Sequence, residues 1–320
     1  MNNYVNEEYK CTLDDKLLKQ AKNELHEDPK NRLGAVETFR KWIKEQPHIS
    51  CPTDTPFLLR FLRVAKFSQL VAREYLTNSI KLLTERPLWF ANIDIHEERV
   101  MNFLRTGYFL FPERRDSHGR QICIMRPAVI DPSMKTYDKA DLHRAAYGFF
   151  TYYFAKEENQ VCGFTFMIDL TGFSLAQSKV WTLDDTRLSG RMWNKCLPAR
   201  VKSINYYNHG PIFEGLFEMF KSFMSKKMKE RVRFHGSNLE SIYKVVPKEC
   251  LPVEYLPDDY DGPNAGTIQD LIDDLIRRLT QPHVAEMIRR ESDSSVTKMD
   301  STAFIKDAIP TASFRKLNID

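Results

Sequence analysis

Short apolar runs that alternate with helical segments constrain the fold of this sequence more than any other feature. Four runs have strand character: QICIMRP (121–127), GFTFMIDL (163–170), VKSINYYN (201–208) and RVRFHG (231–236). Helical spacing marks the stretches between them: 138–157, 174–195 and 212–229. Strands that alternate with helices indicate βαβ units, so the sequence predicts an α/β fold with a mostly parallel sheet.

The first hundred residues predict helices and no convincing strand. Apolar residues recur at helical spacing in two early stretches: Leu17, Leu18, Ala21 and Leu25, then Leu33, Val36, Phe39 and Ile43. The segment FLLRFLRVAKF (57–67) follows, and after it comes a long helix that Pro87 ends.

The chain beyond residue 262 carries one clear apolar stripe. It predicts an amphipathic helix through Ile268, Leu271, Ile272, Leu275, Ile276 and Leu279. The residues from about Glu291 are rich in Ser, Thr and Asp and predict a mobile tail. We therefore expect three parts: a helical domain over 1–100, an α/β domain over 101–262, and a C-terminal helix with a mobile tail over 263–320.

Residues 209–236 combine a wide apolar helix face with a basic run. The apolar residues of the segment are Ile212, Phe213, Leu216, Phe217, Met219, Phe220, Phe223 and Met224. Glu214, Glu218 and Lys221 begin a narrow polar stripe, and Pro211 is well placed to start the helix. Such a helix is either buried core or a cover over something apolar.

Composition limits the class of protein. The chain has 320 residues, 28% of them charged, and a net charge of +4, too slight to favour nucleic-acid binding. Six scattered cysteines without a CxxC pair indicate reduced thiols in a cytosolic protein. The polar start and the eleven-residue uncharged run at 145–155 predict neither a secretory signal nor a membrane span. Any membrane contact is expected to be peripheral.

Catalytic motifs are nearly absent. There is no Walker motif, no GxGxxG, no HExxH and no His/Cys pair at zinc spacing, so we expect no cofactor and no metal. GFSLA (172–176) resembles a nucleophile elbow, which would make Ser174 the nucleophile of a hydrolase with Asp258 and His283. Ser174 is equally suited to cap the following helix. Asp169, at a strand end, is either a general base or a ligand of loop amides.

Aromatic and methionine side chains gather near the predicted sheet. Phe164, Phe166 and Ile168 alternate on one strand face, and Trp181, Met192 and Trp193 follow one another on a helical stretch. These residues form either a plain core or the lining of a lipid-sized pocket.

Several segments, in order, resemble the CRAL-TRIO (Sec14-like) lipid-transfer family. FLLRFLRVAKF resembles its N-terminal signature, GYFLFPERRDSHGRQICIMRP its first strand region, and GFTFMIDLTGFS its central strand. INYYNHGPIF, KKMKERVRFHG and LPVEY resemble the lid, the strand after it and the closing motif. The match covers about residues 10–262 and is strongest to the branch of tocopherol-transfer and retinaldehyde-binding proteins. It implies an all-helical N-terminal domain and an α/β domain whose sheet floors a lipid pocket gated by a helix.

The resemblance also assigns residues to the pocket and its gate. It places Ala146, Phe150, Phe164, Ile168, Trp181, Met192, Trp193, Leu197 and Ile204 in the pocket. It makes 210–225 the lid, with Ile212, Phe213, Leu216, Phe217 and Phe220 on its apolar face.

A phosphoinositide site is implied beside the lid. Its matching residues are Arg200 and Lys202 before the lid and Lys227 and Arg231 after it, cations suited to phosphate. Ala65 stands where the family usually has a second arginine, so that basic contact is either lost or supplied by Lys66.

The leading hypothesis is an intracellular carrier, not an enzyme, that exchanges a tocopherol- or retinoid-like ligand at phosphoinositide-containing membranes. The alternatives are a membrane-recruited lipid-sensing adaptor, which binds a partner through the tail from Glu291, and a serine hydrolase built on Ser174.

Overall fold

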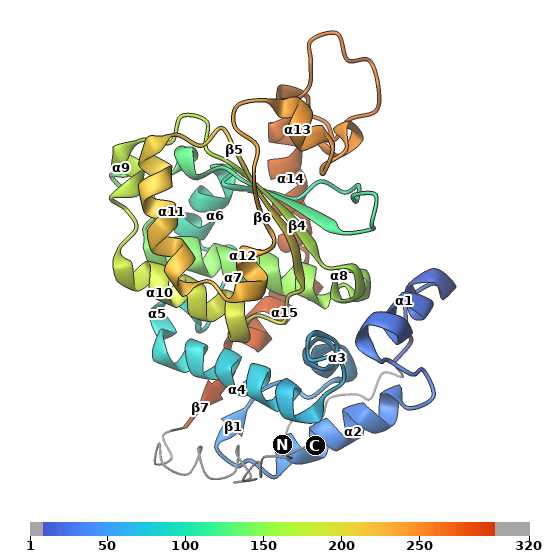
Figure 1. Cartoon of the computed structure of the whole chain (residues 1–320). Coiled ribbons are helices and arrows are strands. Elements are labelled where there is room, and N and C mark those ends of the chain that lie inside the picture. Colours follow the sequence, from blue (N-terminus) through green and yellow to red (C-terminus); the bar gives the residue numbers. More distant parts are fainter. Residues whose placement is uncertain (1–8, 298–320) are drawn as a thin grey trace, which may run out of the picture.

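A five-stranded sheet lies at the centre of the α/β part of the molecule (Figure 1). The structure is a computed structural model and describes residues 9–297. In sheet order the strands are β2 (Phe109–Leu110), β3 (Gln121–Met125), β4 (Phe164–Asp169), β5 (Val201–Tyr207) and β6 (Val232–Phe234). Only β2 pairs antiparallel with its neighbour. The predicted α/β class with a mostly parallel sheet is therefore confirmed.

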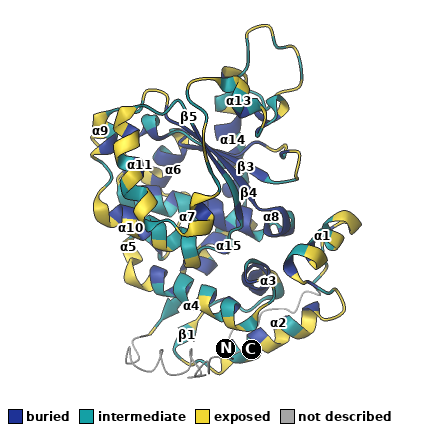
Figure 2. Ribbon diagram, in the orientation of Figure 1, coloured by how far each residue is buried: buried dark blue, intermediate teal, exposed yellow. Residues whose placement is uncertain are grey.

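Side chains alternate between the two faces of this sheet, so each strand contributes to two cores. Cys123, Phe166 and Ile204 are paired across the strands and belong to the larger core. Their neighbours Ile124 and Met167 belong to a second core on the opposite face, which α13 (Leu239–Tyr243) and α14 (Ile268–Leu279) cover. Strands β2, β3 and β4 are buried on both sides (Figure 2), which explains why they are mostly apolar. The edge strand β6 is partly exposed.

Helices surround the sheet and connect its strands. On the face of the larger core lie α6 (Glu98–Arg105), α7 (Lys139–Ala155), α10 (Leu183–Arg191) and α11 (Pro211–Phe223). A π-helical turn, η2 (Met192–Cys196), continues α10. The others are α8 (Glu157–Cys162), α9 (Leu175–Ser178), α12 (Lys226–Lys229), α13 (Leu239–Tyr243), α14 (Ile268–Leu279), α15 (Pro282–Ser292), and the 3-10 turns η1 (Pro127–Val129), η3 (Lys248–Cys250) and η4 (Val253–Tyr255).

The N-terminal part is helical, with one correction. Its helices are α1 (Asp15–Leu25), α2 (Arg32–Lys44), α3 (Thr55–Val64), α4 (Gln69–Glu85) and α5 (Pro87–Phe90). The prediction of no strand here was wrong, because β1 (Ile49–Ser50) pairs antiparallel with β7 (Ser295–Val296). Two-residue strands leave no periodic signal, and this one depends on a partner almost 250 residues away.

The predicted mobile tail from about Glu291 was also wrong for the described residues up to 297. Glu291 ends a buried face of α15 and is 3% exposed. Both of its carboxylate oxygens accept hydrogen bonds from Arg60 of α3, at 2.8 and 3.0 Å. Ser292 is buried as well, and its hydroxyl accepts from the amide of Ile93 at 2.9 Å. The rest of the predicted tail, residues 298–320, lies outside the described residues.

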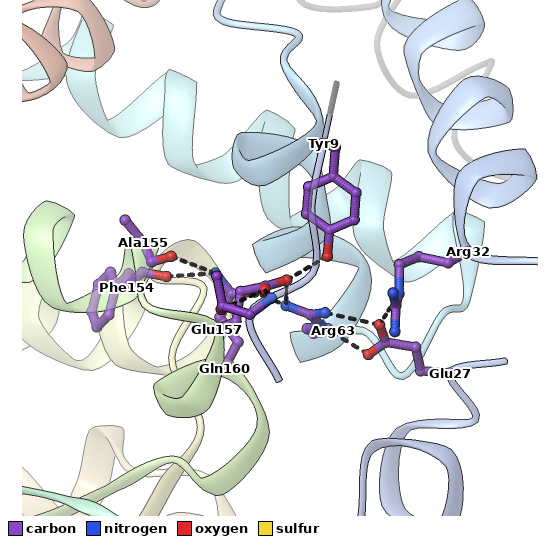
Figure 3. A network of polar contacts seen from close by, with 9 residues as sticks. Tyr9, Glu27, Arg32, Arg63, Phe154, Ala155, Glu157 and Gln160 are labelled. Carbon is purple, nitrogen blue, oxygen red and sulfur yellow. Dashed lines mark hydrogen bonds and ion pairs between the residues drawn. The ribbon is translucent and has the colours of Figure 1, made fainter. Parts of the chain in front are cut away.

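A buried ion network joins the N-terminal helices to the α/β part (Figure 3). Arg63 of α3, with no exposed side-chain surface, donates from Nε and Nη2 to the two oxygens of Glu27, both at 2.8 Å. Its Nη1 donates to Glu157 and Gln160 of α8, at 2.8 and 2.7 Å. Tyr9 donates to Glu157 at 2.5 Å. Burial raises the pKa of Glu157, but Arg63 and hydrogen bonds from Tyr9 and Thr12 outweigh it and hold that pKa at about 2.

Candidate functional site

An apolar cavity of about 290 Å³ lies between the sheet and the helices α7, α10 and α11. Eight of the nine predicted pocket residues line it: Ala146, Phe150, Ile168, Trp181, Met192, Trp193, Leu197 and Ile204. Phe164 does not line it. It lies on the same face of β4 as Phe166, but at the amino end of the strand, where the ring of Phe154 packs against it at 5.6 Å.

Edge-to-face aromatic contacts fix the floor of the cavity. The ring of Trp193 meets Phe150 at 5.4 Å and Phe166 at 5.2 Å, both nearly perpendicular. Such contacts stabilise a defined ring geometry by about 1 kcal/mol each beyond simple burial. The ring of Phe150 is therefore fixed in one orientation and determines the shape of this part of the cavity.

Helix α11 covers the cavity with its inner face and is exposed on its outer face (Figure 2). Of the predicted lid residues, Phe213, Leu216 and Phe220 line the cavity. Phe217 instead packs on Tyr206 and Phe234, with ring centroids 5.5 and 4.9 Å away, and Ile212 is 43% exposed. The apolar part of segment 209–236 thus forms a surface helix, α11, over a cavity and not a core helix.

Specific contacts hold the C-terminal end of α11 to η2. Asn194 donates from Nδ2 to the carbonyl of Phe223 at 3.0 Å, and its Oδ1 accepts from the amide of Ser225 at 3.3 Å. A side chain at Gly190 would bring its Cβ within 2.8 Å of the Cβ of Phe223, so this close approach requires glycine. At the other end, Gly210 has no atom near its missing Cβ. Helix α11 is therefore held at its carboxyl end by hydrogen bonds as well as by close packing.

A second, polar cavity of about 360 Å³, here called the basic basin, adjoins the apolar one. Arg200, Lys202, Lys227 and Arg231, the four residues of the predicted phosphoinositide site, all line it, and so does Lys66. Trp193, Asn194, Val201 and Met228 line both cavities and form a wall between them. Folding thus brings α1, α3, β5 and α12 together around one cluster of cations.

The basin concentrates positive charge that the protein only partly neutralises. Glu24 of α1 accepts from Arg200 at 2.7 Å and from Lys202 at 3.0 Å. Burial raises the pKa of Glu24, but these two cations outweigh it and hold that pKa at about 2. Burial, Arg231 and Lys66 lower the pKa of Lys227, and no carboxylate within residues 9–297 forms an ion pair with it. Mutual repulsion of this kind favours an anionic ligand.

The residues considered for catalysis have structural partners. Ser174 caps α9, with its Oγ accepting from the amide of Ala176 at 3.2 Å, and it also bonds to Gln177. Asp169 accepts from the amide of Thr171 at 2.9 Å and from the hydroxyl of Tyr255 at 2.6 Å. These contacts match the capping and loop-binding interpretations of the two residues.

Cysteines, metal-ligand clusters and helix hydropathy complete the description of residues 9–297. All six cysteines are free thiols, four of them buried, and Cys11 and Cys51 are half-buried. Between residues 9 and 297, no cluster of three potential metal ligands occurs. No helix in the same range combines the length and apolar character needed to cross a bilayer.

Comparison with known proteins identifies the family to which this chain belongs. Residues 104–255 match the family described as the CRAL/TRIO domain, and residues 28–100 match the Pinta-like UBA domain. The chain belongs to the CRAL-TRIO family of lipid-binding and lipid-transfer proteins, as the sequence motifs predicted.

The relatives of this chain include alpha-tocopherol transfer protein-like proteins and clavesins. The chain is 31% identical to the alpha-tocopherol transfer protein-like protein of Mus musculus, over 77% of this chain and 71% of the relative. It is 28% identical to clavesin-1 of Xenopus laevis, over 76% of this chain and 73% of that protein. The solved structure titled "Crystal structure of Sfh5" matches with a TM-score of 0.42 at 13% identity, over 82% of this chain and 98% of that chain, too loose a likeness for any functional argument.

Proposed function

We propose that this protein is an intracellular carrier that takes up one small hydrophobic molecule, tocopherol- or retinoid-like, and exchanges it at phosphoinositide-containing membranes. The observation that carries the proposal is the apolar cavity under α11, directly beside a basin of five cations. An apolar molecule in the cavity loses its contact with water, which favours uptake by about 25 cal/mol per Å² of buried apolar surface. The relatives named for tocopherol transfer support the ligand class.

Helix α11 acts as the gate in this proposal. Moving it away exposes Phe213, Leu216 and Phe220, which costs free energy in water but much less against lipid. A phosphoinositide head group in the basic basin holds this end of the protein on the membrane, since each cation near an anionic surface contributes about 1 kcal/mol. The basin and the gate meet at Ser225, the residue that Asn194 binds.

Transfer between vesicles tests the proposal. Retinol or α-tocopherol is loaded into the protein, and its arrival in acceptor vesicles is followed with and without phosphatidylinositol bisphosphate. We expect transfer to be faster to vesicles that contain the phosphoinositide. Binding without any transfer, or transfer at the same rate to both vesicle types, would contradict membrane-coupled exchange.

Asn194→Ala is expected to accelerate release of the bound ligand about threefold to tenfold. The substitution removes both side-chain hydrogen bonds that hold the end of α11, and a neutral hydrogen bond contributes about 0.5–1.5 kcal/mol. Release is measured by stopped-flow fluorescence of retinol on dilution into vesicles. Lys195→Ala is the matched control, because Lys195 is the next residue of η2 and pairs with Glu74 of α4, both side chains being exposed. An unchanged release rate in the Asn194 variant would show that this contact does not restrain the gate.

Glu24→Gln is expected to tighten binding of inositol trisphosphate about fivefold. The carboxylate of Glu24 competes with a phosphate for Arg200 and Lys202 and also repels it. At a partly exposed site, removing one like charge a few ångströms away lowers the binding free energy by about 1 kcal/mol. Calorimetric titration measures the change. Asp15→Asn removes the same charge from the first turn of the same helix and serves as control. Equal affinity of wild type and Glu24→Gln would mean that the phosphates do not reach these two cations.

A further inference from the structure

Ser225 is an exposed serine at the point where the gate helix meets the basic basin. It follows α11 and precedes α12, and it lines the basin. The residue is exposed, and its Oγ accepts a long hydrogen bond from the amide of Met228 at 3.3 Å. Its hydroxyl is therefore accessible from solvent and only weakly held, beside a cluster of cations.

The chain around Ser225 has the form that protein kinases bind. Met224 has φ −79° and ψ 137°, and Ser225 has φ −62° and ψ 156°, so the backbone is extended between the two helices. Lys226 and Lys227 follow directly and are exposed. Kinases bind extended segments and select them partly by charge, so an exposed serine followed by lysines suits a kinase with an acidic substrate groove.

The basin has more positive charge than the described part of the protein neutralises. Five cations line it, and Glu24 is the single carboxylate among its lining residues between positions 9 and 297. The carboxylate of Glu24 is paired with Arg200 and Lys202. Burial lowers the pKa of Lys227, and repulsion from Arg231 lowers it further, which indicates positive charge without compensation.

A phosphate on Ser225 matches these cations in charge and in position. It brings a charge of about −1.5 to −2 at neutral pH and three acceptor oxygens. Ser225 precedes Lys227 and Arg231 on the same short segment, and all three residues line the basin. A group tethered this closely has an effective concentration on the order of millimolar, so it competes with a head group that enters from a membrane.

We propose that Ser225 is a phosphorylation site and that its phosphate occupies the basic basin in place of a phosphoinositide head group. A kinase transfers the terminal phosphoryl group of ATP: the bond between Oγ and phosphorus forms, the bond between that phosphorus and ADP breaks, and the hydroxyl proton passes to a base of the kinase. The modified protein then holds its own anion in the basin and no longer binds a head group there. This inference rests on the proposed function and adds the regulation of its basin.

Phosphoserine introduced at position 225 of the full-length protein by genetic encoding tests whether the phosphate competes. We expect the affinity for inositol trisphosphate, measured by calorimetric titration, to be at least about thirtyfold weaker than that of wild type. The reason is that the tethered phosphate takes the charge-assisted contacts that the soluble head group otherwise makes.

Phosphoserine at position 222 is the matched control. Ser222 is exposed on α11, donates to the carbonyl of Met219 at 2.7 Å and does not line the basin. The same charge at this position should weaken binding less than about threefold, because solvent and salt screen it. Similar losses from phosphate at both positions would indicate general repulsion and overturn the competition.

Phosphorus NMR reports where the phosphate lies. Nearby cations favour the dianion, so the phosphate at position 225 should lose its second proton about one pH unit lower than the phosphate at position 222. In the variant Lys227→Ala with Arg231→Ala this difference between the two positions should largely disappear. Equal titration midpoints in the otherwise unaltered protein would overturn the placement of the phosphate in the basin.

The modification and the proposed function are tested separately. Wild type is incubated with ATP and protein kinase C, a kinase that selects basic segments, and mass spectrometry of its peptides should place phosphate on Ser225. Absence of phosphate there would overturn the assignment of Ser225 as a modification site. Failure of unmodified wild type to bind inositol trisphosphate would instead overturn the proposed exchange at phosphoinositide-containing membranes, while the phosphorus titration still decides where the phosphate lies.

Discussion

Replacing Arg63 by methionine is expected to lower the free energy of unfolding by about 3–5 kcal/mol. The substitution takes Arg63 from two buried carboxylates: Glu27 keeps its ion pair with Arg32, and Glu157 is left without an ion pair in residues 9–297. Breaking a buried pair on one side costs this much because the remaining charge cannot return to water. Urea denaturation, followed by circular dichroism, measures the loss. It is a large fraction of the stability of an ordinary domain.

Two further variants show whether the network itself is responsible. Arg191→Met breaks an exposed pair with Glu85 between α10 and α4, and it should cost less than about 1 kcal/mol. The double variant Arg63→Met with Glu157→Gln removes the charge that loses its ion pair, while Glu27 keeps Arg32, and it should recover much of the lost stability. A double variant less stable than Arg63→Met would show that the cost comes from lost packing and not from unpaired charge.

Reversing two charges of the basic basin, Lys227→Glu with Arg231→Glu, is expected to weaken inositol trisphosphate binding at least a hundredfold. Hydrogen bonds to charged groups contribute about 1.5–3 kcal/mol each, and two are replaced here by repulsion. Both side chains line the basin, and neither forms an ion pair with a carboxylate in residues 9–297. Calorimetric titration at physiological salt measures the affinity, because a soluble head group separates direct contact from attraction to a charged surface.

The same short segment supplies a matched control. Lys226 and Lys229 of α12 are exposed and do not line the basin, so Lys226→Glu with Lys229→Glu makes the same net charge change. This control should weaken binding less than about tenfold. Similar losses in both double variants would indicate general attraction of anions to a basic surface rather than a defined site.

Local patterns in the sequence were sufficient for the sheet and much of the candidate site. The alternation of Phe164, Phe166 and Ile168 correctly gave one face of β4, because a strand repeats every two residues wherever it lies. Whether a residue on that face meets a cavity depends on what covers it. Phe154 covers Phe164, and no spacing within β4 contains that information.

Partners distant in sequence account for what could not be predicted. Glu24 and Arg200 are 176 residues apart, and Asn194 and Ser225 are 31 apart, so their roles follow only from the folded arrangement. Glu291 was assigned to a tail because its neighbours are polar, yet its carboxylate is buried in an ion pair with Arg60. For the arginine that Ala65 replaces, the sequence left two possibilities: the cation is lost, or Lys66 supplies it. Lys66 lines the basin, which favours the second possibility.

The cavity and the basin share a wall formed by Trp193, Asn194, Val201 and Met228, through which binding at one site would affect the other. If a bound head group lowers the affinity of the protein for its cargo by some factor, thermodynamic linkage requires that bound cargo lower the affinity for the head group by the same factor. In the proposed carrier, loaded and empty protein would then distribute unequally over one membrane, with the empty protein staying longer at the surface. Such coupling speeds the exchange of cargo, whereas its net direction is still set by the difference in cargo activity between the two membranes.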